Sequence, residues 1–379
     1  MKIVIAGGGT GGHIYPGIAI AQELQRVDIK NQILFIGSEE GIERILIPKE
    51  RLSIVTIKSR GMLRKLSYKA ISSPFMLMIG FMQSLKILVK FRPDIVVVTG
   101  GYVSLPVAFA AFCLRMPVIL HEENVKPGMS ARIIKWMASA VTVSFETTRR
   151  YFKFKRKVHC FGNPVRREII DTLRGVAIQN LGLKQSDRVV LIFGGSQGAR
   201  SINNIVKDML PLVAGLNLMV IHISGERDYE QLNKQELGRI YPFYKLVPYM
   251  YNIADGLAAA DLVVSRAGAT AISEIAVRGI PSILVPFPFS SGGHQDLNAK
   301  VMADAGASRI IWNKDLNASV LTEEIKQILN NKEICEFMGR SARNIGRIDA
   351  AKEIVMLMYD AAGKSDLLNR RVGRRTKVG

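Results

Sequence analysis

Cysteine is scarce in this sequence: the 379 residues contain only Cys113, Cys160 and Cys335. Their scattered positions, without a Cys-x-x-Cys pair, rule out a disulfide framework and argue against a structural zinc site. So few thiols fit a reducing compartment. Histidine is also rare, with five in the chain. A histidine beside a glycine-rich segment is therefore a candidate for proton transfer.

Several motifs with a defined chemistry are missing. The sequence has no Asp-x-Asp pair of the kind that clamps a metal ion on a nucleotide diphosphate. It has no GxxxxGK[ST] phosphate-binding loop. Its basic residues do not form a recognisable nucleic-acid-binding module. These absences argue against P-loop enzymes and an acidic metal clamp, and we expect no metal site.

Acidic residues are outnumbered by basic ones, 32 to 52, which gives a formal charge of +20. Residues 1–163 carry +14, residues 164–363 carry +1 and residues 364–379 carry +5. With 48% hydrophobic residues the chain is not a disordered polyelectrolyte. A uniformly basic protein would spread its charge evenly. The concentration in the first half predicts a polyanionic partner, either nucleic acid or an anionic membrane.

Long hydrophobic runs are lacking, and the best candidate, Ile71–Phe91, is a poor membrane-spanning helix. Its uncharged stretch contains polar residues and is shorter than the ~20 apolar residues that a span needs. An apolar middle with basic flanks is typical of a helix that lies in a membrane interface, although a helix buried under a sheet has a similar composition. The residues that carry the membrane interpretation are Phe75, Met78, Ile79, Met82, Lys65, Lys69 and Lys86. The chain starts with an apolar strand and no signal region, which predicts a cytoplasmic protein.

Strand-like Val/Ile/Leu runs alternate with helical stretches, which predicts an α/β fold with parallel sheets. A strand, a glycine loop and a helix occur at residues 1–12 and again at residues 189–199, so we expect two Rossmann-like domains. The turn signal Gly-Asn-Pro places the boundary after residue 163. The predicted parts are residues 1–163, residues 164–340, a helix at 341–363 that packs back towards the first domain, and a disordered basic tail at 364–379.

The first glycine loop, Gly7–Gly12, satisfies GxGxxG between a strand and a helix. Amides at a helix N-terminus can approach an anionic group there. A dinucleotide site also needs an acid at the end of the second strand, and Glu39 lies just beyond that position, which is a weak match. His13 follows the loop and is a candidate general base, or alternatively a structural residue that caps the helix.

Five more segments place polar groups where open α/β sheets bind ligands. A second glycine loop with Ser196 suits a diphosphate. Glu274, about one turn into a later helix, suits a ribose diol, or alternatively complements the helix dipole. A glycine-rich loop precedes His294 and Gln295, which suit a sugar, although an exposed loop and helix cap would look the same. The segments at 100–104 and 121–128 each follow a predicted strand.

Together these segments resemble the MurG family of N-acetylglucosaminyltransferases of peptidoglycan synthesis. The resemblance runs in the family's order from residue 1 to about residue 360. The matching blocks are GGGTGGH (7–13), GGYVS (100–104), HEENVKPG (121–128), GNPVR (162–166), GGSQGAR (194–200), GATAISE (268–274) and HQDLNA (294–299).

The resemblance implies a GT-B fold, with a C-terminal domain that binds UDP-GlcNAc and an N-terminal domain that binds a lipid-linked acceptor, lipid I. It implies an inverting transferase without an obligatory cofactor, peripheral at the cytoplasmic face of a bacterial membrane, with anionic lipid and other cell-wall synthesis proteins as partners. His13 is the implied base. Donor contacts are implied for Thr10, Gly11, Gly12, Asn124, Arg166, Ser196, Met250, Ala269, Thr270, Glu274 and Gln295, and acceptor contacts for Gly100, Gly101 and Tyr102.

The chain departs from the family pattern in two places. Some members carry Gln-Gln where this sequence has His294-Gln295, which leaves open which side chain contacts the sugar. The basic tail after residue 364 is not part of the pattern. Three alternative functions remain open: a glycolipid synthase with a diacylglycerol acceptor, a nicotinamide-dependent oxidoreductase, and a basic RNA- or membrane-binding protein without enzymatic activity.

Overall fold

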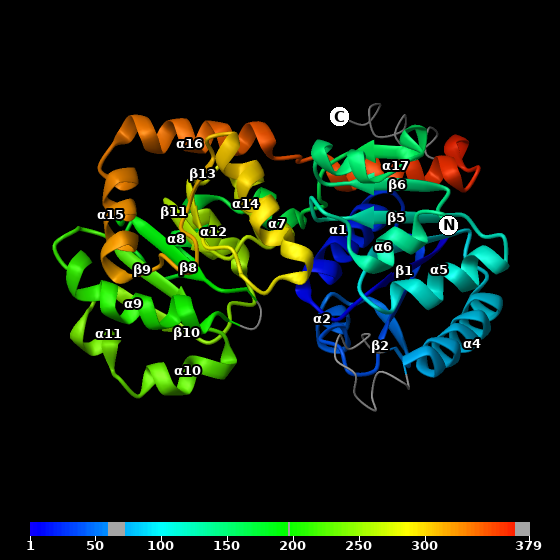
Figure 1. The fold of residues 1–379 in the computed structure, drawn as a ribbon, viewed down its shortest axis with the longest axis horizontal. Coiled ribbons are helices and arrows are strands. Elements are labelled where there is room, and N and C mark those ends of the chain that lie inside the picture. The colour runs from blue at the N-terminus through cyan, green and yellow to red at the C-terminus, as the bar shows by residue number, and fades with distance from the viewer. Residues whose placement is uncertain (60–72, 196–197, 368–379) are drawn as a thin grey trace. The chain divides into compact units, whose positions relative to one another are not determined.

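The computed structural model describes residues 1–59, 73–195 and 198–367. The chain divides into two compact units (Figure 1). The first unit contains Met1–Arg166 and the chain from Asp349 onward, and the second contains Arg167–Ile348. The first boundary between the units, after Arg166, thus lies three residues beyond the boundary after residue 163 that the Gly-Asn-Pro signal predicts.

The first unit is built on a parallel seven-stranded sheet. Its central strands are continuous apolar runs because helices cover both of their faces. The strand order is β3 (Ser53–Ile57), β2 (Gln32–Ser38), β1 (Lys2–Gly7), β4 (Ile95–Gly100), β5 (Val118–Glu122), β6 (Ala140–Val143) and β7 (Val158–Cys160).

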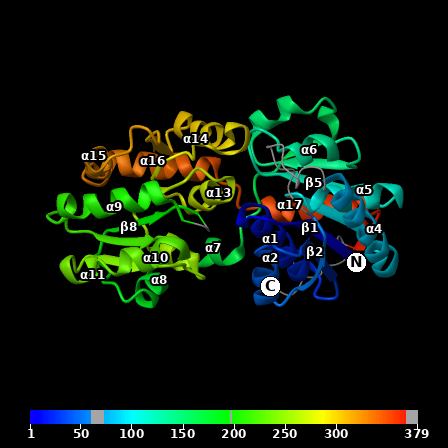
Figure 2. The same ribbon diagram turned by 60° about the horizontal axis from the view of Figure 1, so that its bottom comes forward.

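Alternate residues of β1 belong to two separate cores, one on each face of this sheet. Val4 and Ala6 join the core beneath α4 (Ser73–Phe91), α5 (Ser104–Cys113) and α6 (Met129–Ile134). Ile3 and Ile5 join the core beneath α1 (Gly11–Val27), α2 (Glu43–Lys49) and α17 (Ala350–Ala361). Helices α4, α5 and α6 therefore form one layer and α1, α2 and α17 the other (Figures 1 and 2).

The predicted terminal helix at 341–363 is wrong in its bounds, because this stretch contains parts of two helices. Helix α16 (Lys332–Ile345) packs on α13 (Ala269–Arg278) and α15 (Ala318–Leu329) in the second unit, whereas α17 packs on α1. The Tyr359 hydroxyl of α17 is buried and accepts a hydrogen bond of 3.1 Å from Asn31 Nδ2. Lys364, which we expected in a disordered tail, forms a 2.8 Å ion pair with Asp94. Residues 368–379 of that tail lie outside the described residues.

The second unit repeats this topology with six parallel strands. Their order is β10 (Tyr244–Val247), β9 (Met219–Ile223), β8 (Val189–Phe193), β11 (Leu262–Ser265), β12 (Ser282–Leu284) and β13 (Ser308–Ile310). One face of β8 packs with α9 (Arg200–Val213) and α15 (Ala318–Leu329). Leu191 points to the other face, where it meets Gly256 of α12 (Ile253–Ala259). The remaining helices are α7 (Arg167–Asp171), α8 (Arg174–Asn180), α10 (Glu226–Asn233), α11 (Leu237–Ile240), α13 (Ala269–Arg278) and α14 (His294–Asp304).

Both sheets place the loops after their central strands, β1 and β8, at their carboxyl edges, where the strand order reverses. In open α/β sheets this is the position at which ligands bind. Within the described part of the chain, none of the helices is long and apolar enough to span a membrane.

Candidate functional site

The first glycine loop leaves no room for side chains where β1 enters α1. A Cβ at Gly7 would lie 2.0 Å from the Thr99 hydroxyl, and one at Gly8 would lie 2.3 Å from a carboxylate oxygen of Glu43. The buried Glu43 accepts a hydrogen bond of 3.1 Å from the Gly9 amide and two more from Ser38. A carboxylate therefore occupies the part of this loop where a dinucleotide fingerprint would place a pyrophosphate.

The loop after β4 lies directly against the first glycine loop. A Cβ at Gly100 would lie 2.4 Å from His13 Nδ1, and one at Gly101 would lie 2.3 Å from the Gly8 carbonyl. Both residues have positive φ, +111° and +80°, which other residues rarely adopt. Glycine at these two positions lets the chain pass beside the imidazole of His13.

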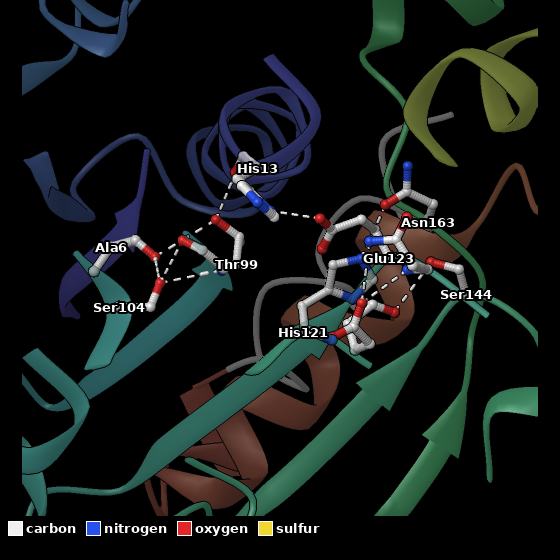
Figure 3. Close-up of polar contacts among 12 residues, drawn as sticks. Ala6, His13, Thr99, Ser104, His121, Glu123, Ser144 and Asn163 are labelled. Carbon is white, nitrogen blue, oxygen red and sulfur yellow. Dashed lines mark hydrogen bonds and ion pairs between the residues drawn. The ribbon is translucent and has the colours of Figure 1, made fainter. Parts of the chain in front are cut away.

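His13, in the first turn of α1, forms an ion pair with Glu123, in the segment after β5 (Figure 3). His13 Nδ1 lies 2.5 Å from Glu123 Oε1, and the exposed fractions of the two side chains are 27% and 4%. Burial by itself lowers the pKa of His13, but the charge and hydrogen bond of Glu123, with a contribution from Glu122, outweigh it and raise the pKa to about 9. His13 is thus mainly in its imidazolium form at neutral pH.

Hydrogen bonds hold the backbone of His13 and the strand that precedes Glu123 in place. The Thr99 hydroxyl donates to the His13 carbonyl at 2.6 Å, and the Ser104 hydroxyl lies 3.1 Å from the Ala6 carbonyl (Figure 3). On the other side, the buried ring of His121 contacts Thr142 at 3.0 Å and Asn163 at 2.9 Å. Burial lowers the pKa of His121, so this ring is neutral.

A second buried carboxylate shapes the segment that follows β5. Glu122 accepts hydrogen bonds from the amides of Asn124 at 2.9 Å and Gly128 at 3.0 Å. Burial raises the pKa of Glu122, and the neighbouring charge of Glu123 raises it further. These bonds fold residues 124–128 back onto the strand end and leave Glu123 facing His13.

The other residues predicted from the first unit lie around the same sheet edge. Gly11 and Gly12 begin α1, Thr10 precedes it and is exposed, and Tyr102 is also exposed. The guanidinium of Arg166 is buried and lies 4.0 Å from the ring centroid of Tyr15 on α1. This edge therefore carries His13, Thr10, Gly11, Gly12, Asn124, Gly100, Gly101 and Tyr102.

The second glycine loop precedes α9 in the other unit. A Cβ at Gly198 would lie 2.1 Å from the Ser224 carbonyl, and Gly198 has a φ of +73°. Ser196, predicted to contact a diphosphate, lies outside the described residues. Behind the loop, Asn203 Nδ2 donates to the Ser224 carbonyl at 2.9 Å, and Asn203 Oδ1 lies 3.0 Å from the buried ring of His222. This network ties α9 to the end of β9.

The remaining predicted donor residues lie on loops and helices of the same unit. Ala269, Thr270 and Glu274 are buried in α13. The side-chain carbonyl of Gln295 in α14 accepts a hydrogen bond of 2.9 Å from the Phe287 amide. Met250 lies between β10 and α12, and its sulfur would meet a Cβ at Gly256 at 2.8 Å.

Arg266, after β11, is a residue whose place the sequence did not predict. Its buried guanidinium donates to the Val285 carbonyl at 3.0 Å, the Pro286 carbonyl at 3.1 Å, Asn313 Oδ1 at 3.0 Å and the Ser201 hydroxyl at 2.6 Å. All four partners are neutral oxygens, and burial lowers the pKa of Arg266 to about 10. Arg266 thus remains a cation beside the first turn of α9, which contains Ser201.

Helix α4 has one apolar side in the core and another that is exposed. Leu88 is buried, whereas Phe75, Met78 and Met82 are exposed and Ile79 is half-buried. Lys86 lies on the same helix, and Lys65 and Lys69 lie outside the described residues. The helix is therefore neither fully buried under the sheet nor fully exposed.

The site in the first unit is arranged for proton transfer, because an imidazole is oriented by a carboxylate through one ring nitrogen. The second unit presents backbone amides and a buried cation, which suit an anion. Across the described residues there is no group of three or more His, Cys, Asp or Glu side chains arranged to hold a metal ion.

Two family models match the chain in sequence order. The N-terminal domain of glycosyltransferase family 28 matches residues 3–143, and its C-terminal domain matches residues 189–354. The protein is therefore a two-domain glycosyltransferase of family 28.

Curated relatives narrow this class. UDP-N-acetylglucosamine--N-acetylmuramyl-(pentapeptide) pyrophosphoryl-undecaprenol N-acetylglucosamine transferases of Thermoanaerobacter sp. (strain X514) and Acetivibrio thermocellus are 40% and 39% identical to it. These alignments cover 94% and 95% of this chain and 99% and 98% of the relatives. The chain belongs to this family, the MurG family, which confirms the resemblance seen in the sequence.

Solved structures agree with the predicted fold. A crystal structure of Acinetobacter baumannii MurG, 26% identical, matches with a TM-score of 0.72 over 95% of this chain and 99% of that one. A UDP-GlcNAc 2-epimerase from Neisseria meningitidis, 16% identical, matches with a TM-score of 0.69 over 95% of this chain and 100% of that one, and shares the fold. The predicted α/β fold with two Rossmann-like domains is confirmed.

Sequence reasoning missed three residues of the first site. Glu123 was visible in the HEEN block, but nothing in one sequence shows that it faces His13. Glu43 lies four positions beyond Glu39, the weak match for the acid of a dinucleotide site, and accepts a hydrogen bond from the Gly9 amide. Thr99 ends an apolar strand, and its contact with the His13 carbonyl depends on tertiary structure.

Proposed function

We propose that this protein transfers N-acetylglucosamine from UDP-GlcNAc to the 4-hydroxyl of the muramoyl sugar of a lipid-linked acceptor, lipid I, to give lipid II in peptidoglycan synthesis. Membership of the family and the names of the relatives support the donor and the acceptor. The observation in the structure that carries the proposal is the 2.5 Å pair of His13 and Glu123 at the carboxyl edge of the first sheet.

The two units divide the substrates in this proposal. The first unit, with Gly100, Gly101 and Tyr102 beside His13, binds the acceptor, and Thr10, Gly11, Gly12 and Asn124 contact the transferred sugar. The donor residues of the second unit are Ser196, Met250, Ala269, Thr270, Glu274 and Gln295. Arg166, the last residue of the first unit before Arg167, is a further proposed donor residue. Backbone amides at the start of α9 and the cation of Arg266 favour the diphosphate.

In the reaction, His13 accepts the proton of the 4-hydroxyl through the ring nitrogen that does not face Glu123. The acceptor oxygen bonds to the anomeric carbon as the bond from that carbon to the diphosphate breaks, and UDP departs. Attack from the opposite side inverts the configuration and gives a β-1,4 linkage. Because the pKa of His13 is raised to about 9, the neutral imidazole is a minor form at neutral pH, and Glu123 stabilises the imidazolium that forms.

An enzyme with a lipid-linked acceptor acts at a membrane surface. We assign contact with the membrane to the exposed side of α4. Phe75, Met78 and Met82 are exposed apolar side chains on α4, with Ile79 half-buried beside them and Lys86 on the same helix. Lys65 and Lys69 add to the basic flank in the sequence. An apolar stripe with basic flanks suits an anionic interface at the cytoplasmic face of the membrane.

A nicotinamide-dependent oxidoreductase is disfavoured by Glu43. Its carboxylate binds the Gly9 amide and would repel a pyrophosphate in the same loop. The glycolipid synthase differs only in its acceptor, diacylglycerol.

The deciding experiment measures UDP release from UDP-GlcNAc with lipid I and, in parallel, with diacylglycerol. We expect turnover with lipid I alone. Turnover with diacylglycerol alone would replace the proposed acceptor, and a thermal shift with NADH but none with UDP-GlcNAc would overturn the donor.

A further inference from the structure

Residues 149–157 read RRYFKFKRK, with six basic and three aromatic residues in nine positions. The segment runs from the end of η1 (Glu146–Tyr151) through η2 (Lys155–Lys157), between β6 and β7. Every residue from Lys153 to Lys157 is exposed. Neither the transfer reaction nor the proposed contact of α4 uses this segment.

Helix α6 presents exposed apolar side chains beside it. Met129 and Ile133 lie four positions apart on the helix, and Trp136 follows three positions later in the turn after it. These spacings place the three side chains along one side. Single exposed apolar residues are common on protein surfaces, whereas several that gather on one side of an element are typical of interaction sites.

The helix and the basic segment form one surface. The rings of Trp136 and Phe154 meet edge to face, with centroids 5.4 Å apart, and each side chain is 56% exposed. Lys135 Nζ lies 5.5 Å from the Trp136 ring centroid and donates to the Tyr151 carbonyl at 3.4 Å. We call this the aromatic–basic surface, and it consists of Met129, Ile133, Trp136, Lys153, Phe154, Lys155, Arg156 and Lys157.

We propose that the aromatic–basic surface binds the anionic headgroups of a phospholipid bilayer, as a second membrane contact separate from α4. Lys153, Lys155, Arg156 and Lys157 supply four charges that complement phosphate-bearing lipids. Trp136 has an amphipathic ring and Phe154 has an apolar ring. Such side chains are favoured at the membrane–water interface, near the lipid headgroups. Helix α5 lies between α4 and α6 in the same layer, so the two contacts are on different helices of one unit (Figures 1 and 2).

The apolar members favour lipid over RNA as the partner. RNA would use the cations and stack bases on the rings, but it gains little from the aliphatic side chains of Met129 and Ile133. A bilayer uses all three kinds of group at once. This proposal rests on surface residues and stands whether or not the transfer reaction is as proposed.

Two contacts on one compact unit act together. After the first contact forms, the second binds from a high effective concentration, so the pair holds the unit far more tightly than either contact alone. The aromatic–basic surface would also restrict rotation of the unit about α4.

The first test compares two triple charge reversals of equal net change. K155E/R156E/K157E alters the proposed surface, and K207E/K234E/K314E alters exposed lysines of the second unit. Binding is measured to vesicles of phosphatidylcholine with phosphatidylglycerol and to vesicles of phosphatidylcholine alone. We expect the first variant to lose at least about tenfold in affinity for the anionic vesicles, since each basic residue near the surface contributes substantially. The control should keep wild-type affinity.

The second test uses Trp136 as a local reporter. The chain has two tryptophans, so W312F leaves Trp136 alone. We expect its emission to shift to the blue on anionic vesicles and to be quenched by brominated phosphatidylglycerol. Adding K155E/R156E/K157E should abolish both effects. Adding F75S/M78S/M82S, which removes apolar groups of α4, should leave the shift in place at saturating lipid.

Three results would overturn the proposal. The first is equal affinity of the two triple variants for anionic vesicles. The second is unchanged Trp136 emission when all protein is vesicle-bound. The third is tight binding of single-stranded RNA with no response to lipid. Transfer to lipid I in detergent micelles, measured on the same variants, reports separately on the proposed function, and K155E/R156E/K157E should retain wild-type kcat there.

Discussion

The two glycine loops follow the same strand–loop–helix plan, yet their surroundings differ in chemistry. The first is surrounded by titratable groups, with His13, Glu123 and Glu43 in contact with it or beside it. The second has a neutral network of Asn203 and His222 behind it and the cation of Arg266 beside its helix. A repeated fold therefore surrounds one loop with groups suited to proton transfer and the other with groups suited to anion binding.

Two histidines show how far the surroundings decide this difference. Burial lowers the pKa of His222 to about 3, and its hydrogen-bond partners, the Tyr244 hydroxyl and Asn203, are neutral. Burial acts on His13 in the same direction, but Glu123 reverses the outcome and raises its pKa to about 9. One carboxylate thus separates a structural histidine from a candidate base.

The largest effect is expected from removing the imidazole of the first site. H13A should lower kcat by ~10²–10⁴ and leave the Kd of UDP-GlcNAc largely unchanged, as loss of a general base does. The control is H159Q, on β7, which should keep normal turnover. Near-normal kcat in H13A would exclude His13 as the base.

A smaller effect is expected on the pH profile when the partner is altered. In the wild type, kcat/KM should rise with pH up to about 9, which is the pKa of His13 in the enzyme without bound substrate. In E123Q the lost negative charge should move this limb down by about one pH unit or more, because an opposite charge shifts a pKa by roughly one to three units. If the rise of kcat/KM occurs at the same pH in E123Q as in the wild type, it reports the titration of a group other than His13.

A loss of about tenfold in UDP affinity is expected for R266Q, since the variant removes a charged hydrogen-bonding group worth roughly 1.5–3 kcal/mol. R266K keeps the charge and should retain most of the affinity. Isothermal titration calorimetry with uridine distinguishes the loss of the charge from a disturbed fold. Uridine has no diphosphate and should bind all three proteins equally. Equal losses for UDP and uridine would indicate a structural role.

The smallest effect is expected on stability. The folded pKa of His13, about 9, lies above its ordinary value of 6.5, so the ion pair stabilises the fold fully below pH 6.5 and loses this contribution as the pH rises through 9. The difference in Tm between wild type and H13Q should therefore shrink by roughly a few degrees from pH 6.5 to pH 9.5. A constant difference would mean that the pair does not stabilise the folded unit.

Much of the fold could be predicted from the sequence because its signals are local. The apolar runs at Ile3–Ala6 and Val189–Phe193, each followed by glycines, predicted both loops and both Rossmann-like domains. The family resemblance also depended on contiguous blocks. The pairing of His13 with Glu123, which are 110 positions apart, depends on strand order and could not be predicted from spacing. The same holds for α17, whose packing partner α1 is at the other end of the chain.

The return of α17 to the first unit also constrains how the chain is made. The second unit, Arg167–Ile348, is inserted within the first, so its whole sequence is synthesised before the last helix of the first unit exists. Until then the apolar face of α1 that α17 covers, and the Asn31 side chain that donates to Tyr359, lack their final partner. During synthesis, the unit that begins second can therefore complete its fold first, and the unit that begins first must wait for its C-terminal helix.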